Sequence, residues 1–574
     1  MKNFPLYEVK KILNLKDMLE KSCSDFNGKT AFLTKRKGSD EYHPITYSQF
    51  KSDVDALGTI LLKLGLKGKN IAIIGENRYE WAVSYLAVVN GTGIVVPIDK
   101  ELPQNEIESL MKRSKASTLI FSDYNKESVL KMKNSTAEDK PGIYIGMDYE
   151  SESDGVLSYQ QLIEEGRKLV NSGDTGFLKA VIDAEAMSIL LFTSATTDKS
   201  KAVMLSHHNI CANLMSMCSM TYIGNDDIFL SVLPIHHTYE CTCGFLCPLY
   251  RGSAIAYCEG LRHIPKNLQE SKATIMLGVP LIFETMYRRI WDQAAKKPEM
   301  LKKLKLGLKI SKLLRKIGID VRKKLFAPVH ESFGGSIRLL ISGAAGIDPA
   351  VSKGFRELGL FLIQGYGLTE CAPIVALNRD VDFRDNATGL PLPGVDVRID
   401  KPGEGGIGEI IVKGPSVMLG YYSDEEATRK VLTDGWFHTG DLGYMDSDKF
   451  VYITGRAKNV IVTKNGKNIF PEEIEALLDR SPYIKESLIF GKNDEVFGDI
   501  VVSAIIVPDM ERIADDFAEK MPNAQELNAL IHKEVKSVNK NLVLYKYIRD
   551  FQLRENEFAK TTTKKIKRYL EKTV

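Results

Sequence analysis

The first half of the chain repeats one pattern, in which short β-branched apolar runs alternate with amphipathic helical stretches. Such runs are NIAIIG (70–75), GIVVPI (93–98), STLIFS (117–122) and SILLFTS (188–194). Between the first two lies RYEWAVSYLAVVNG, a helical pattern that a glycine ends. Strands that alternate with helices predict an α/β fold with parallel sheets flanked by helices. In such folds, ligands bind at the carboxyl ends of the strands.

The sequence pattern changes twice in the second half of the chain. From about residue 390, PGVDVRIDKPGEGGIGEIIVKGP is typical of β-hairpins with glycine-rich turns. Its G-x-G-x-x-G match at Gly403, Gly405 and Gly408 is not a dinucleotide site, because a strand is expected after it instead of a helix. Near Gly455 a short α+β pattern begins. We therefore predict a large N-terminal domain at 1–454 with a β-rich subdomain at about 390–454, a boundary at 455–459, and a small α+β C-terminal domain at 460–574.

Composition excludes some classes of protein. A chain of 574 residues exceeds what one core supports, so about two to four domains are expected. Its 44% hydrophobic and 26% charged residues are typical of a soluble globular protein. A net charge of +3 argues against a nucleic-acid partner. The sequence shows neither a signal-peptide pattern nor a run of about 18 apolar residues, so we expect neither export nor a membrane span.

The eight cysteines lie mostly in apolar surroundings. Because no export signal is seen, we interpret them as reduced thiols of a cytoplasmic protein. The cluster CTCGFLC (241–247) matches no zinc-ligand spacing. It therefore favours buried, small apolar side chains over a metal site.

One segment is strongly basic. KKLKLGLKISKLLRKIGIDVRKKLF (302–326) contains ten basic residues and one acid, Asp320, and its leucines and isoleucines recur at helical spacing. A basic amphipathic helix can bind an anionic membrane surface, which would place the protein on the inner face of a membrane. The alternative is a solvated helix whose apolar stripe packs on the protein core. The sequence leaves both interpretations open.

A loop rich in hydroxyls and lysine follows the last of the apolar runs. The stretch ILLFTSATTDKSKAVMLSHHNI (189–210) has no glycine between Thr193 and Ala202. Hydroxyls, backbone N–H groups and lysine at the carboxyl end of a strand favour a phosphate ligand. The lack of glycine restricts the backbone angles that such a loop can adopt.

This loop resembles the phosphate loop of the AMP-forming acyl-CoA synthetases, the adenylate-forming superfamily, whose pattern is roughly T-S-G-T-T-G-x-P-K-G. The threonines, the serine and Lys201 match, whereas Ala195, Asp198, Ser200 and Ala202 replace three glycines and a proline. Five further motifs resemble those of the family in their order and spacing, and the LPIHHTYE motif and the basic segment make the long-chain fatty acyl branch the nearest relative. These motifs are LPIHHTYE (233–240), QGYGLTE (364–370), GWFHTGDLGYMD (435–446), ITGRAKNVIVTKNGKNIFPEEIE (453–475) and AKTTTKKIKR (559–568).

The resemblance implies ATP, Mg²⁺ and coenzyme A as ligands and a small-molecule carboxylic acid as substrate. The acid, a medium- to long-chain fatty acid, would form an acyl-adenylate and then a thioester with coenzyme A. One alternative is a ligase that loads a carrier protein or uses an aryl acid. Another is a non-catalytic nucleotide- or acyl-binding homologue with a degenerate phosphate loop. Acyl chain length and oligomeric state are not specified by these patterns.

The resemblance also implies individual roles. The implied ATP- and AMP-binding residues are Thr193, Ser194, Thr196, Thr197, Lys201, Gly343, Ala344, Ala345, Gly365, Tyr366, Gly367, Asp441 and Arg456. The implied catalytic residues are His237, Thr369, Glu370, which would also hold Mg²⁺, and Lys565. Lys458 is implied as the hinge of a mobile C-terminal domain, and Gly466 as part of the path for coenzyme A.

Residue chemistry agrees with several of these roles. Tyr366 can stack on adenine, Asp441 can accept two ribose hydroxyls, and Glu370 offers the carboxylate oxygen that Mg²⁺ prefers. Lys564 stands where the family has glycine, so the catalytic lysine is Lys565 or its neighbour. For His237, a packed core histidine is the alternative.

Overall fold

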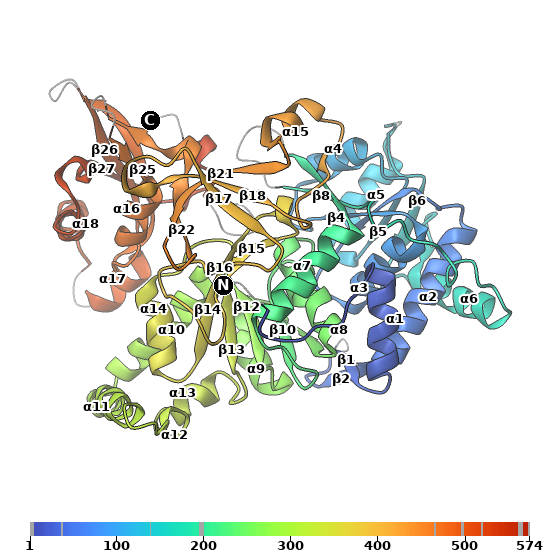
Figure 1. Cartoon of the computed structure of the whole chain (residues 1–574), viewed down its shortest axis with the longest axis horizontal. Coiled ribbons are helices and arrows are strands. Elements are labelled where there is room, and N and C mark those ends of the chain that lie inside the picture. The colour runs from blue at the N-terminus through green and yellow to red at the C-terminus, as the bar shows by residue number, and fades with distance from the viewer. Residues whose placement is uncertain are drawn as a thin grey trace. The chain divides into compact units, whose positions relative to one another are not determined.

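The computed structural model describes residues 5–35, 38–137, 139–193, 200–463, 467–494, 499–517, 521–560 and 566–571. The chain forms two compact units. Unit 1 comprises Met1–Asp396 and Val412–Phe437, and unit 2 comprises Val397–Ile411 and His438–Val574. The predicted α/β class is confirmed, with large, mainly parallel sheets in unit 1 and a smaller α+β arrangement in unit 2 (Figure 1).

An eight-stranded sheet of unit 1 contains the four apolar runs of the sequence pattern. Its order is β19-β9-β8-β4-β3-β5-β6-β7, in which β3 to β8 are parallel and β9 and β19 continue the sheet antiparallel. The strands are β3 Asn70–Ile74, β4 Ile94–Ile98, β5 Thr118–Phe121, β6 Ile143–Gly146, β7 Leu157–Ser158, β8 Met187–Phe192, β9 Ala202–Ser206 and β19 Gly420–Tyr421.

A nine-stranded sheet forms the other half of unit 1. Its order is β16-β15-β14-β13-β12-β10-β11-β1-β2, with β1 and β10 to β14 parallel and β2, β15 and β16 antiparallel to their neighbours. The strands are β1 Thr30–Lys35, β2 Tyr42–Thr46, β10 Ile228–Ser231, β11 Ala254–Tyr257, β12 Ile275–Gly278, β13 Leu339–Ser342, β14 Phe361–Gly367, β15 Ile374–Leu377 and β16 Leu390–Pro391.

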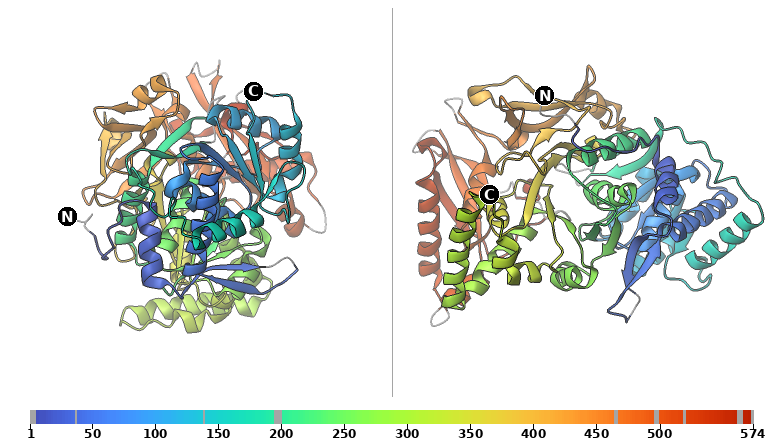
Figure 2. Two further views of the ribbon diagram at one scale, coloured as in Figure 1. Left: turned by 90° about the vertical axis from the view of Figure 1, so that its right-hand side faces the viewer. Right: turned by 60° about the horizontal axis from the view of Figure 1, so that its bottom comes forward.

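Helices cover both sheets of unit 1 (Figure 2). One apolar core lies where Phe283 and Phe355 pack on β10, β12, β13 and β14, and a second lies between the eight-stranded sheet and helices α4 and α5. The helices are α1 Leu15–Phe26, α2 Tyr47–Lys63, α3 Tyr79–Ala87, α4 Gln104–Ser114, α5 Lys126–Asn134, α6 Tyr159–Asn171, α7 His207–Met220, α8 Cys247–Arg251, α9 Ile264–Ser271, α10 Pro280–Ala295, α11 Pro298–Arg315, α12 Arg322–Leu325, α13 Ala327–Ser332, α14 Pro349–Glu357 and α15 Glu425–Val431, with short helices η1 Val88–Thr92, η2 Asp123–Asn125, η3 Tyr239–Leu246, η4 Leu261–His263 and η5 Thr369–Cys371.

The chain passes between the units within β17 Asp396–Asp400, β18 Gly408–Lys413 and β21 Trp436–Met445. These strands form a sheet with β20 Leu432–Thr433 and β22 Val451–Arg456. A strand, β18, follows the G-x-G-x-x-G match, as predicted. The two compact units do not divide at 455–459. The domain boundary and hinge predicted at these residues would be a joint between moving parts, and they stay a proposal.

The rest of unit 2 is a small α+β structure. Its three-stranded sheet, β25-β26-β27, packs on α16 and α18 around residues such as Ile474, Ile489 and Ile531. The elements are β23 Ile461–Val462, β24 Asn468–Ile469, β25 Ile484–Asp494, β26 Asp499–Pro508, β27 Ile548–Leu553, α16 Pro471–Leu478, α17 Met510–Asp516 and α18 Ala524–Asn539, with short helices η6 Glu404–Gly406, η7 Ala457–Asn459, η8 Leu544–Lys546 and η9 Arg568–Leu570.

Two further predictions from the sequence can be compared with the structure. Cys241, Cys243 and Cys247 are buried, in agreement with their interpretation as small apolar side chains. Burial raises the pKa of the Cys241 and Cys243 thiols, and the contact with the Cys218 thiol together with burial raises the pKa of Cys247. The basic segment 302–326 spans parts of two helices, α11 and α12, because the chain turns at Gly318, whose φ of +80° suits glycine. No helix within the described ranges is long and apolar enough to cross a bilayer.

Candidate active site

The hydroxyl-rich loop joins two antiparallel strands of unit 1. β8 and β9 pair in a hairpin, and at its loop end the Thr193 N–H and hydroxyl both donate to the Lys201 carbonyl oxygen, at 2.9 and 3.3 Å. Ser194, Thr196 and Thr197 lie outside the described residues. The loop leaves the carboxyl end of β8, which is parallel to β4, so its position fits the predicted ligand site.

Arg113 anchors the loop at Ser200, the position where the family has proline. Its guanidinium donates to the Ser200 hydroxyl at 2.8 Å and also to the Ser200 carbonyl oxygen. The same guanidinium lies over the ring of Phe192, 5.1 Å from its centroid. These contacts from α4 restrain the end of the loop in place of a proline ring. Arg113 was not among the site residues predicted from the sequence.

Tyr421 connects two of the predicted motifs. Its hydroxyl donates to Oε1 of Glu370 at 2.9 Å, and the Nζ atom of Lys201 lies 4.4 Å from the centroid of its ring. Tyr421 is 5% exposed, and burial together with the neighbouring Glu370 raises the pKa of its phenol, so it remains a protonated donor. Lys201 and Glu370 therefore contact the ring and the hydroxyl of one buried side chain. Tyr421, too, was not among the site residues predicted from the sequence.

The LPIHHTYE and QGYGLTE motifs also meet in unit 1. The Thr238 hydroxyl lies 3.3 Å from that of Thr369, which starts the short helix η5. Asn213 of α7 donates from Nδ2 to the Ile374 carbonyl oxygen at 2.7 Å, and so anchors the segment that follows η5. Four sequence segments, around 201, 238, 370 and 421, thus form one connected cluster.

The two neighbouring histidines of LPIHHTYE have different surroundings. His237 is half-buried, and its Nδ1 atom accepts from the backbone N–H of Tyr239 at 3.3 Å. His236 lies with Nε2 3.6 Å from Oδ2 of Asp99, at the end of β4. Burial lowers the pKa of the His236 imidazole, although Asp99 opposes this shift. A neutral imidazole is therefore favoured at His236.

Two of the segments implied to bind the nucleotide lie at neighbouring parallel strands: 343–345 directly follows β13, and 365–367 forms the end of β14. After β13, Gly343 lies against Tyr239, so a Cβ there would come 2.7 Å from the ring, and Ala344 adopts a φ of +70°. Ala345 continues this turn. In β14, a Cβ on Gly367 would lie 2.1 Å from the Pro373 carbonyl oxygen.

Tyr366, predicted to stack on adenine, is only 9% exposed in this structure. Its neighbours Gly365 and Gly367 belong with it to β14 and pair with β15. The strand therefore fixes the backbone of all three residues.

Unit 2 contains the predicted ribose and hinge residues. Asp441 of β21 and Arg456 of β22 are directly opposite in the ladder, and Nε of Arg456 lies 2.7 Å from Oδ1 of Asp441. Asp441 is 5% exposed, and its backbone N–H donates to the hydroxyl of Thr439. Lys458 lies in η7, directly after β22. A carboxylate fixed in this way can accept hydroxyl groups of a sugar.

Lys565 and Gly466 lie outside the described residues. Of the described residues that flank 561–565, Lys560 and Ile566 form a bridge, and the Lys567 N–H donates to the Ala559 carbonyl oxygen at 2.8 Å. Near Gly466, the amine of Lys467 pairs with Glu404 at 3.0 Å.

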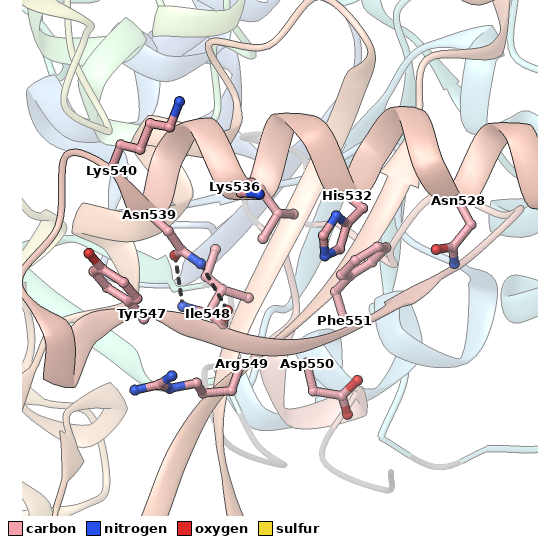
Figure 3. Close-up of a pocket in the computed structure, with 11 residues that line it drawn as sticks. Asn528, His532, Lys536, Asn539, Lys540, Tyr547, Ile548, Arg549, Asp550 and Phe551 are labelled. Carbon is pink, nitrogen blue, oxygen red and sulfur yellow. Dashed lines mark hydrogen bonds between the residues drawn. The ribbon is translucent and has the colours of Figure 1, made fainter.

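Unit 2 also has an open pocket of about 590 Å³ between α18 and β27 (Figure 3). A pair of hydrogen bonds between the Asn539 side chain and the Ile548 backbone joins its walls, and the rings of His532 and Phe551 lie 6.2 Å apart. Among the described residues, none that the sequence singled out for the site lines this pocket.

Comparisons with known proteins agree with the motifs. Residues 19–422 match the family model described as AMP-binding enzyme, and residues 458–569 match that of the AMP-binding enzyme C-terminal domain. Fatty acyl-CoA synthetase A of Dictyostelium discoideum is 28% identical over 95% of this chain and 82% of its own length. Long-chain-fatty-acid–CoA ligase 5 of Rattus norvegicus is 29% identical over 85% of this chain and 74% of its own length.

Solved structures share the fold. ATP-bound MatB from Rhodopseudomonas palustris has a TM-score of 0.74 at 23% identity, covering 97% of this chain and 98% of that one. The first family model alone covers well over half of the chain. The chain therefore belongs to the AMP-binding enzyme family, the adenylate-forming superfamily that its motifs resemble.

Proposed function

We propose that this protein is an AMP-forming fatty acid–CoA ligase that acts on a medium- to long-chain fatty acid. Membership of the AMP-binding enzyme family supports adenylate formation. Relatives that match most of the chain are named fatty acyl-CoA synthetases or long-chain-fatty-acid–CoA ligases, which supports the acid and the thiol acceptor. The eight buried or half-buried cysteines suit a reducing cytoplasm, where we place the reaction.

The observation that carries the proposal is the contact of Tyr421 with both Lys201 and Glu370. Lys201 and Glu370 are 169 positions apart in the chain, and both contact the buried side chain of Tyr421. A cation and a carboxylate placed in this way suit a ligand that needs both, such as a metal-bound polyphosphate. The Thr238–Thr369 contact joins the LPIHHTYE motif to the same cluster, and we propose that this motif lies near the acid.

In the first half-reaction, a carboxylate oxygen of the acid attacks the α-phosphorus of ATP, and the bond to the β-phosphate oxygen breaks. Thr193 and Lys201, with Ser194, Thr196 and Thr197, would hold the departing pyrophosphate by hydrogen bonds and charge. Thr369 and Lys565 would bind the α-phosphate, where negative charge increases in the transition state. His237 would lie near the acid's carboxylate.

The residues around Glu370 fit Mg²⁺. Glu370 is half-buried, one of its carboxylate oxygens is oriented by Tyr421, and Thr369, which carries a hydroxyl, precedes it in the chain. This is an all-oxygen donor set, which the ion prefers together with phosphate oxygens. When bound, Mg²⁺ would neutralise phosphate charge.

In the second half-reaction, the sulfur of coenzyme A attacks the acyl carbonyl carbon, the bond to the AMP oxygen breaks, and AMP leaves. Asp441 and Arg456 would hold the ribose of the nucleotide, and the segments 343–345 and 365–367 its base. Lys458 would act as the hinge about which the C-terminal domain moves between the two half-reactions. Gly466 would border the path of the coenzyme A thiol.

The proposal is tested by product analysis. The purified protein is incubated with ATP, Mg²⁺, either palmitate or a benzoate, and either coenzyme A or a phosphopantetheine carrier protein, and thioester and AMP are quantified. Palmitoyl-CoA and AMP in equal amounts are expected, and Lys201→Ala should reduce both. A thioester on the carrier protein alone, or with benzoates alone, would replace fatty acid–CoA ligation with the corresponding alternative.

A further inference from the structure

Helix α11 has one apolar stripe that packs on the core of unit 1. Leu304, Gly307 and Ser311 are buried, and Leu301 and Leu308 pack against the core cluster that contains Phe326. This stripe explains why the segment folds as a helix on α10 and α14. It does not account for the other apolar residues of the segment.

A second apolar stripe of the same segment is exposed. Leu306, Ile310, Leu313 and Ile317 follow one another at spacings of four, three and four residues, so they share one face of the helix and its C-terminal turn. Their exposed fractions are 57%, 40%, 68% and 69%. Ile319 and Leu325, which are also exposed, extend the apolar surface to α12. Figures 1 and 2 show α11 and α12 beside each other at the periphery of unit 1.

Basic side chains surround this exposed stripe. They are exposed, and none takes part in an ion pair within the part of the chain that the structure describes. The acid of the segment, Asp320, pairs with Arg322 at 2.6 Å, and this arginine holds the pKa of Asp320 at about 2. The unpaired basic residues are Lys302, Lys303, Lys305, Lys309, Lys312, Arg315, Lys316, Lys323 and Lys324.

We propose that this basic apolar face, residues 302–325, is a docking surface for an anionic phospholipid bilayer. The exposed leucines and isoleucines would enter the interface between headgroups and acyl chains, and the lysines would contact the anionic headgroups. An anionic bilayer offers negatively charged headgroups and an apolar acyl-chain region together. A second copy of the same face would bring like charges together, which disfavours self-association through it.

The proposal is tested by sedimentation of the full-length protein with vesicles. One set of vesicles is phosphatidylcholine alone, and the other contains 30% phosphatidylserine, a composition chosen to supply negative charge. Because a basic residue near an anionic surface strengthens binding by about fivefold, removal of three charges should weaken binding about a hundredfold. The wild type should therefore bind the anionic vesicles strongly and the neutral ones weakly.

Two triple variants separate charge from apolar insertion. Lys305→Gln/Lys309→Gln/Lys312→Gln should lose preference for anionic vesicles, and Leu306→Ser/Leu313→Ser/Ile317→Ser should weaken binding to them by tenfold or more at about 0.8 kcal/mol per buried CH₂. All six side chains are exposed, so thermal midpoints should stay close to that of the wild type.

Matched controls change the same residue types elsewhere on the surface. These are Leu544→Ser, at a leucine that is 69% exposed, and Lys67→Gln/Lys179→Gln/Lys533→Gln. Both controls should bind anionic vesicles like the wild type. The proposal is overturned if the wild type does not bind anionic vesicles, or if the face variants bind them as well as the controls do. It is also overturned if the wild type self-associates in sedimentation-velocity runs without lipid and the face variants lose this self-association while vesicle binding is unchanged.

Discussion

The contact between Tyr421 and Glu370 gives the most specific prediction for catalysis. In Tyr421→Phe the ring stays in place over Lys201, and only the hydroxyl that donates to Glu370 at 2.9 Å is removed. A hydrogen bond to a charged group contributes about 1.5–3 kcal/mol, which corresponds to about tenfold to a hundredfold in rate or affinity. We therefore expect acid-dependent ATP–pyrophosphate exchange to fall by this factor.

The assay measures exchange at several Mg²⁺ concentrations, because a less well oriented Glu370 should also raise the Mg²⁺ concentration needed for half-maximal rate. The adjacent Tyr422→Phe removes a hydroxyl without a hydrogen bond in the described part of the chain, and it should exchange like the wild type. Exchange by Tyr421→Phe within about twofold of the wild type at all Mg²⁺ concentrations would refute the positioning role.

Three further changes test other parts of the account. Lys565→Ala should lower adenylation about a hundredfold or more but leave thioester formation from added acyl-adenylate nearly unchanged, whereas the same result in Lys564→Ala would move the role by one residue. Arg113→Ala removes the hydrogen bonds that anchor Ser200 and should raise KM for ATP about tenfold. An unchanged KM would show that ATP binding does not depend on this anchor. Burial raises the pKa of Glu240 from 4.5 to about 8, so the native state keeps a proton that the unfolded chain loses, and the free energy of unfolding should fall as pH rises between these values. Glu240→Gln should remove this fall, which can approach about 1.4 kcal/mol per pH unit, and thermal midpoints that decline equally in both proteins from pH 5.5 to 8 would contradict the assignment.

The elements of the fold were largely predictable because parallel strands buried on both faces are almost continuously apolar. The runs 70–75, 93–98 and 117–122 correspond to β3, β4 and β5 within one residue at each end. The strand expected after the glycine-rich stretch is β18. In these segments local composition and tertiary burial favour the same structure, so sequence alone is sufficient.

The contacts of the site were less predictable, because they join residues far apart in the chain. Tyr421 and Glu370 are 51 positions apart, and Arg113 and Ser200 are 87 apart, so no local spacing relates them. Arg113 replaces a restraint that the motif comparison had shown to be missing, and this absence was the one available signal. In the basic segment, helical periodicity indicated an apolar stripe but could not show that one stripe is buried and a second is exposed.

The most direct test of the central claim is ATP–pyrophosphate exchange by the purified wild-type protein. The acids range from acetate to palmitate and include benzoates, and ATP binding is measured separately. The account predicts no exchange without acid and the fastest exchange with a medium- or long-chain fatty acid. ATP binding without exchange for any acid would contradict it, and would show that the glycine-free loop between Thr193 and Ala202 binds the nucleotide without supporting adenylation.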